Sequence, residues 1–69
     1  MNNSKYPELV NQMTLRNERL RNIAKLLNVN ISQISRRLTG ETKWTVDEAE
    51  ILIKHYKLDF ETLFKRKED

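Results

Sequence analysis

The side chains with the clearest chemical potential lie in one short polar stretch near the middle of the chain. Ile34 and Leu38 are four residues apart, so in a helix they share one face. At about 100° per residue, Ser32, Arg36 and Thr39 then lie on the opposite face. Hydroxyl and guanidinium groups displayed together in this way can make directed hydrogen bonds to a polar ligand.

No other group of residues suggests chemistry. The chain has no cysteine and a single histidine, His55. A disulfide is therefore excluded, and a zinc site would need mostly carboxylate ligands, which is unusual. We expect His55 at the surface, opposite the helix face that carries Ala49 and Ile53. With no nucleophile beside it, we expect neither an enzyme nor a metal or cofactor site.

The elements that position the polar stretch are expected to be helices throughout. Apolar residues recur at a helical period, with Pro7 in the first turn of the first periodic segment and Gly40 after the third. The expected core faces are Tyr6, Leu9, Val10 and Met13; Leu20, Ile23, Ala24 and Leu27; Ile34 and Leu38; and Val46, Ala49, Ile53 and Tyr56. A short fifth helix is expected to carry Phe60, Leu63 and Phe64. We predict an all-α, compact five-helix domain over residues 1–69, with a charged tail at 65–69.

Residue types suited to helix ends separate these segments. Asn28 tolerates the left-handed conformation in which helices often end, and Asn30 is a good N-cap for the next helix. Gly40 ends that helix. Thr45 and Glu48 have the spacing of a capping box at the start of the fourth helix.

The strongest functional signal is the short joint between the second and third helices. Only about three residues, Asn28 to Asn30, separate them, and such a tight joint gives a steep crossing, as in a helix-turn-helix. Ala24 is small where the helices approach each other, and Val29 supplies an apolar side chain in the turn. We predict a helix-turn-helix at about residues 20–39.

The sequences IAKLLNVN at residues 23–30 and QISRRLTG at 33–40 resemble the lambda-repressor-like (XRE) family. The similarity covers about residues 6–64 and is greatest to phage-type members. Leu20, Asn28 and Arg37 depart from the family pattern, in which glutamine, glycine and an apolar residue are usual. The resemblance implies that the third helix enters the major groove of DNA while the second lies across the phosphate backbone.

The polar stretch then acquires a specific interpretation. Arginine pairs with guanine, glutamine with adenine, and serine with either. The predicted base-contacting residues are Ile31, Ser32, Gln33, Ser35 and Arg36. For Ile31, core packing and a thymine-methyl contact both remain open. The predicted phosphate-contacting residues are Arg19, Arg21, Lys25, Asn30, Arg37, Thr39 and Lys43.

Charge is unevenly distributed along the chain. Residues 1–43 hold eight basic and three acidic residues, net +5, and residues 44–64 hold two basic and five acidic, net −3. The last five residues add +1, giving +3 for the whole chain. A positive face directed at a polyanion fits this pattern, and a solvated surface with chance clustering fits it equally well.

Two features favour a partner protein. A chain of 69 residues without a disulfide buries only about 60% of its unfolded surface, so its stability is marginal. Ile51 and Leu58, with His55 between them, form a second apolar stripe opposite the core face of the fourth helix. Either the fifth helix covers the stripe, or the stripe is a homodimer interface with Phe60 and Phe64 beside it. Such a dimer could form in free solution or only on DNA.

We therefore predict a sequence-specific, double-stranded-DNA-binding transcriptional regulator, a repressor of phage, mobile-element or bacterial origin, without a small-molecule effector. The alternative is a protein-interaction module, such as an antitoxin or anti-repressor, that keeps the same fold. No run reaches the roughly 18 apolar residues of a membrane span, and residues 1–7 lack an apolar signal core. The expected location is the cytoplasm.

Overall fold

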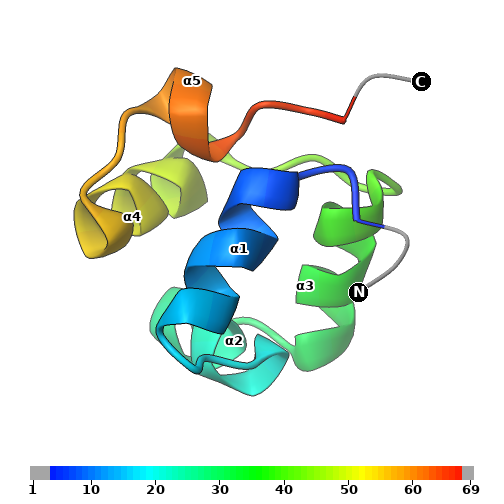
Figure 1. The fold of residues 1–69 in the computed structure, drawn as a ribbon. Coiled ribbons are helices and arrows are strands. Elements are labelled where there is room, and N and C mark those ends of the chain that lie inside the picture. The colour runs from blue at the N-terminus through cyan, green and yellow to red at the C-terminus, as the bar shows by residue number, and fades with distance from the viewer. Residues whose placement is uncertain (1–3, 68–69) are drawn as a thin grey trace.

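The computed structural model describes residues 4–67, which fold into five α-helices (Figure 1). They are α1 (Pro7–Leu15), α2 (Leu20–Leu27), α3 (Ile31–Thr39), α4 (Val46–Tyr56) and α5 (Phe60–Leu63). No strand occurs within residues 4–67, so the predicted all-α, five-helix architecture is confirmed. Residues 1–3 and 68–69, the ends of the predicted domain and its tail, lie outside the described residues.

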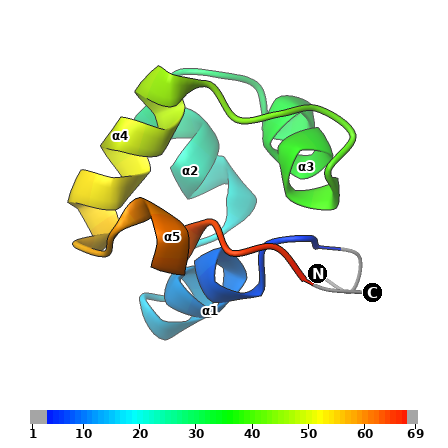
Figure 2. The ribbon, with the colours of Figure 1, turned by 90° about the horizontal axis from the view of Figure 1, so that it is seen from above.

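One core receives side chains from every helix. Its seven most deeply buried large side chains are Leu9 and Met13 of α1, Ile23 of α2, Ile34 and Leu38 of α3, Leu52 of α4 and Leu63 of α5. In Figure 2, α3 and α4 lie on opposite sides of the molecule, and α1 and α5 lie next to each other. Because each helix buries only one face, the opposite face of α3 remains free for a ligand.

The core face predicted for α4 was partly wrong. Val46 is 73% exposed, and Ile53 is only partly buried. Leu52 is fully buried instead, and Ala49 and Tyr56 lie beside it as predicted. In a helix, the residues three and four positions after Ala49 both lie near its face. The sequence pattern suggested Ile53, but the packing of α4 buries Leu52.

Four residues with positive φ end the helices or lie in the loops between them. Asn28 adopts φ 58°, as predicted, and Gly40, at 85°, follows α3. Asn17 and Lys57 adopt the same left-handed conformation, with φ 55° and 58°. Lysine has a Cβ that this conformation disfavours, so Lys57 carries a strain that a glycine would not.

An aromatic cluster covers the core near the two chain ends. Trp44 packs edge-on against Tyr6 and Phe64, with ring centroids 6.3 and 5.7 Å away. Trp44 therefore acts as a lid on the core. The Lys5 amide donates to the Leu38 carbonyl over 2.7 Å, which joins the segment before α1 to the end of α3.

The second apolar stripe predicted on α4 does not form as a continuous surface. Leu58 lies beyond the end of α4 and packs against the core, while Ile51 remains 39% exposed. The left-handed turn at Lys57 redirects the chain, so the seven-residue spacing no longer keeps Leu58 in line with Ile51. The dimer interface predicted there therefore loses one of its two central residues.

Candidate nucleic-acid interface

The turn between α2 and α3 has the tight geometry that the sequence predicted. The amide of Val29 donates to the carbonyl of Ala24 over 2.9 Å, and the Val29 side chain packs against the core. The Asn30 amide donates to Gln33 Oε1 over 2.9 Å, so α3 begins directly after the turn. Figure 2 shows α3 end-on while α2 lies across the view, which is the steep crossing of a helix-turn-helix.

Four of the five residues predicted to contact bases lie on the exposed part of α3. Ser32, Ser35 and Arg36 are exposed, and Ile31 is 50% exposed. Ile34, on the opposite face, is fully buried. The face assignments are therefore confirmed, and Ile31 is available for an apolar contact outside the core. The base contacts themselves remain predictions.

Gln33 and Thr39 are half-buried and make local hydrogen bonds. Gln33 Oε1 already accepts the hydrogen bond from the Asn30 amide, and Thr39 Oγ1 donates to the carbonyl of Arg36 over 3.0 Å. A glutamine that pairs with adenine through both atoms of its amide needs Oε1 as well as Nε2. Gln33 would have to give up its bond to Asn30 to make that contact.

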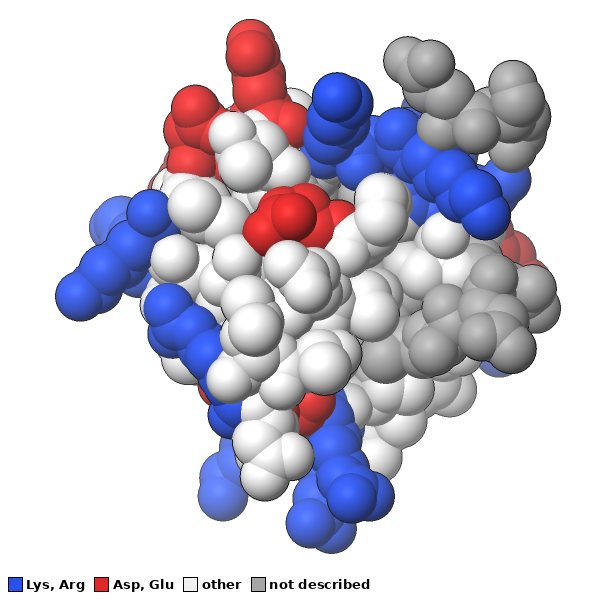
Figure 3. All heavy atoms as spheres, in the orientation of Figure 1, with Lys and Arg blue, Asp and Glu red and all other residues white. Residues whose placement is uncertain are grey.

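Basic side chains of α2 and its neighbours are free to meet a polyanion. Arg19, Arg21, Lys25 and Lys43 are all exposed. Figure 3 shows basic side chains projecting at the bottom of the view, where the α1–α2 loop and α2 lie, and acidic side chains at the top left near α5. Basic side chains also project at the left and at the upper right of the same view, so positive charge is not confined to the helix-turn-helix.

Leu20, the first residue of α2, is partly buried against the core. The polar contact that a glutamine makes at this position in the XRE family is therefore absent. The side chain of Asn22 accepts a hydrogen bond from the Arg19 amide over 2.7 Å, which fixes the start of the helix.

Arg37 is held inside the protein. Its Nε lies 2.8 Å from Glu48 Oε1, and the two side chains are only 13% and 10% exposed. The same carboxylate oxygen accepts from the Thr45 amide over 3.0 Å, while Thr45 Oγ1 accepts from the Glu48 amide over 3.1 Å. The predicted capping box is confirmed, and its carboxylate also ties α3 to α4. A phosphate contact by Arg37 would require this ion pair to open.

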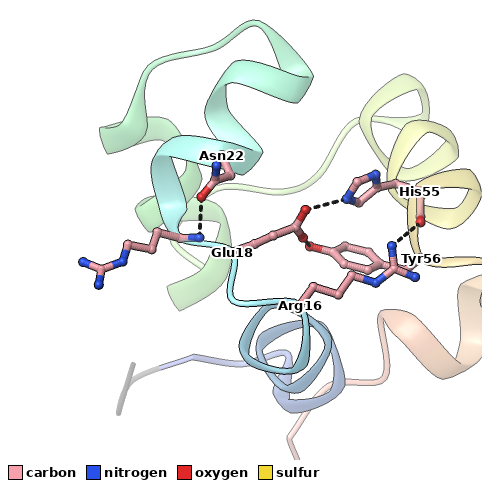
Figure 4. Close-up of polar contacts among 6 residues, drawn as sticks. Arg16, Glu18, Asn22, His55 and Tyr56 are labelled. Atoms are coloured by element: carbon pink, nitrogen blue, oxygen red, sulfur yellow. Dashed lines mark hydrogen bonds and ion pairs between the residues drawn. The ribbon is translucent and has the colours of Figure 1, made fainter.

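A second polar cluster joins the α1–α2 loop to the end of α4 (Figure 4). Glu18 accepts a hydrogen bond from Tyr56 Oη over 2.6 Å and lies 2.8 Å from His55 Nε2. Arg16 donates to the His55 carbonyl over 2.9 Å, and its guanidinium lies over the Tyr56 ring. His55 keeps 29% of its side chain exposed, so it lies at the surface as predicted, but its ring is paired with Glu18 and does not project freely into solvent.

The ionisation of the cluster follows from its contacts. Burial raises the pKa of Glu18, but the hydrogen bonds from Tyr56 and His55 together hold it below its usual value. Burial, reinforced by the hydrogen bond to Glu18, raises the pKa of the Tyr56 hydroxyl. A charged Glu18 facing a neutral Tyr56 is thus the stable state near neutral pH, and it holds the segment leading into α2.

Two exclusions follow from the described part of the chain. No group of three or more histidine, cysteine or acidic residues within residues 4–67 is arranged to hold a metal ion. None of the described helices has the length and apolar character to cross a membrane.

The fold and the exposed α3 face define a helix-turn-helix DNA-binding domain. The chain matches the model of the BetR domain over residues 6–69 and belongs to that family, whose members are helix-turn-helix DNA-binding domains of transcriptional regulators and typically not enzymes. Comparisons with curated proteins and with solved structures gave no match. The expected helix-turn-helix DNA-binding domain is confirmed, whereas the relationship to the XRE family and to its phage-type members remains a prediction.

Proposed function

We propose that this regulator binds a specific duplex sequence and acts as a repressor by occupying its operator. The observation that carries the proposal is the exposed polar surface of α3, where Ser32, Ser35 and Arg36 project away from the buried Ile34. A helix displaying such groups fits the major groove, where each base pair presents a distinct pattern of donors and acceptors.

Two sets of side chains would contact the DNA, one at the bases and the other at the phosphates. Arg36, with Ser32 and Ser35, would read base edges, and Ile31 would contact a thymine methyl group. The exposed cations of α2, such as Arg21 and Lys25, would neutralise phosphates. Phosphate contacts supply affinity and register, whereas base contacts supply sequence preference.

Repression follows as the simplest mode of action for such a domain. Occupancy of an operator by a DNA-binding domain needs neither a cofactor nor an effector. We propose a phage, mobile-element or bacterial origin on the resemblance of residues 23–40 to phage-type XRE members.

We further propose that two copies act together on DNA. One recognition helix reads only a few base pairs, which is too little to find one site in a genome. A two-fold pair would place its α3 helices about 34 Å apart, one turn of the duplex, and would select a near-palindromic operator.

The test is a selection of binding sites from random duplex DNA with the purified protein. Enrichment of one motif, followed by affinities for that motif and a scrambled duplex at several salt concentrations, supports the proposal. Recovery of no motif, with equal affinity for both duplexes, contradicts sequence-specific binding. Affinity that stays flat between low and physiological salt contradicts the phosphate-contacting mode altogether.

A further inference from the structure

An apolar groove opens between the loop after α3, the first turn of α4 and α5. It has a volume of about 370 Å³. Its floor consists of the nearly buried side chains Tyr6, Ala49 and Phe64, with the half-buried Trp44 beside them. A groove of this composition gains free energy when apolar atoms replace the water inside it.

Two large apolar side chains stand exposed on the rim of the groove. Val46 is 73% exposed, and Phe60 is 57% exposed although its ring stacks on Phe64 with centroids 5.1 Å apart. Because that stacking holds the Phe60 ring in place, little conformational freedom is lost when a partner covers it. An apolar groove flanked by fixed apolar projections is typical of a protein-docking surface.

The charges around the groove indicate what covers it. Lys43 and Arg66 are exposed on its rim, and the exposed acids Asp47 and Glu61 directly follow Val46 and Phe60 in the sequence. A uniformly acidic or uniformly basic partner would meet repulsion from one of these pairs. A second copy of this chain carries both signs, so its acids can face the cations of the first copy.

We propose that a second copy of this chain docks here in a two-fold arrangement, with Phe60 and Val46 of each copy seated at the groove of the other. The same patch serves both copies, as two-fold symmetry requires, because each patch holds both the groove and the projections. This inference names the interface for the paired binding proposed above and rests on that function.

The position of the groove is compatible with DNA binding. The loop from Gly40 to Trp44 connects the C-terminal end of α3 to the groove, whereas Ile31, Ser32 and Ser35 lie on the first turns of that helix. Figure 1 shows α5 at the top of the molecule and α2 at the bottom. None of the exposed α3 residues predicted to contact bases lines the groove, so a copy seated there need not cover them.

Because the groove is small, the affinity between two free copies is expected to be low. Stable interfaces bury about 800 Å² on each partner, which is a large share of the 5074 Å² surface of this chain. A patch centred on two side chains per copy gives a weak dimer in free solution. On DNA, two adjacent half-sites raise the effective concentration of the copies, and the same contact then becomes cooperativity.

The experiment compares Phe60→Ala and Val46→Ala with the wild type on one half-site and on two half-sites of the selected operator. Each variant should lower the affinity for the double site about 10-fold through lost cooperativity and change single-site affinity less than about twofold. Leu15→Ala is the matched control, because Leu15 is an equally exposed apolar residue, 70% exposed, on α1 outside the groove.

A second measurement keeps this inference separate from the proposed function. In free protein at millimolar concentration, dilution should shift the NMR signals of groove residues such as Trp44 and Phe60 in the wild type but not in Val46→Ala. If the protein binds no DNA, these shifts still test the pairing. Unchanged cooperativity in both groove variants, or saturation of the double site by a single copy, overturns the inference, and so do dilution shifts located elsewhere.

Discussion

Replacing Glu48 by glutamine tests how the recognition helix α3 is held. Glu48 Oε1 lies 2.8 Å from Arg37 Nε and 3.0 Å from the Thr45 amide. Glutamine keeps a carbonyl oxygen for the Thr45 amide but loses the charge that faces Arg37. The variant thus isolates the ion pair from the helix cap.

The expected cost follows from burial. Removing one partner of a buried ion pair costs about 3–5 kcal/mol. The Arg37 and Glu48 side chains are 13% and 10% exposed, so water partly screens them, and we expect about 2 kcal/mol for Glu48→Gln. Glu48→Ala also loses the cap, for about 1 kcal/mol more. The free energy of unfolding of a domain of this length is roughly 3–10 kcal/mol in total. The glutamine variant is therefore the safer probe, because it removes a smaller part of that stability than the alanine variant.

The assay is urea unfolding of a double-mutant cycle. Arg37→Met alone should cost less, about 1 kcal/mol, because the Glu48 carboxylate keeps the Thr45 amide and lies at the positive end of α4. The cost of the double variant should be smaller than the sum of the two single costs by about 1–2 kcal/mol, which is the coupling energy of the pair. Glu50→Gln, at an exposed acid on the same helix, is the control. Strictly additive costs would refute the claim that one carboxylate joins α3 to α4.

Four further predictions concern DNA binding, strain and pH. Arg36→Ala should cost about 1–3 kcal/mol on the selected site and relax one base position; an equal loss on all sequences would make Arg36 a phosphate contact. Lys25→Ala should lower the slope of log K against log salt by about 1 with the sequence preference kept, and an unchanged slope would remove Lys25 from the interface. Lys57→Gly should raise the free energy of unfolding by about 1 kcal/mol, because φ is 58° there, and a loss would show that the backbone is not strained. Glu18 has a folded pKa below the usual 4.5, so its charge stabilises the fold above that pH, and this contribution is lost as pH falls through the folded pKa. In Glu18→Gln, the free energy of unfolding should depend less on pH in the acid range than in the wild type. An unchanged pH dependence would contradict the lowered pKa of Glu18.

Features set by neighbours within four residues could be predicted from the sequence. The capping box of Thr45 and Glu48, the left-handed Asn28 and the buried pair Ile34 and Leu38 all depend on local spacing. Each of these follows from helix geometry and from the conformational preference of one residue type. The exposed face of α3 was predictable for the same reason.

Contacts between distant segments could not be predicted in this way. Glu18 and His55 are 37 residues apart, and Glu18 and Tyr56 are 38 apart, so no periodicity reports their pairing. Arg37 was predicted to contact phosphate because its charge is visible in the sequence, whereas its partner Glu48 comes close only when α4 folds back on α3. The exposure of Val46 likewise depends on how α4 is rotated against the core.

The division of labour along α3 has a consequence for how such a protein can evolve. Ile34, Leu38 and Arg37 hold the helix in place, whereas Ser32 and Arg36 are exposed, and their side chains make no hydrogen bond to the protein within residues 4–67. Substitutions at these two positions can therefore accumulate without unfolding the domain. A duplicated copy could acquire a new operator through a few such changes, while its inherited framework remained intact.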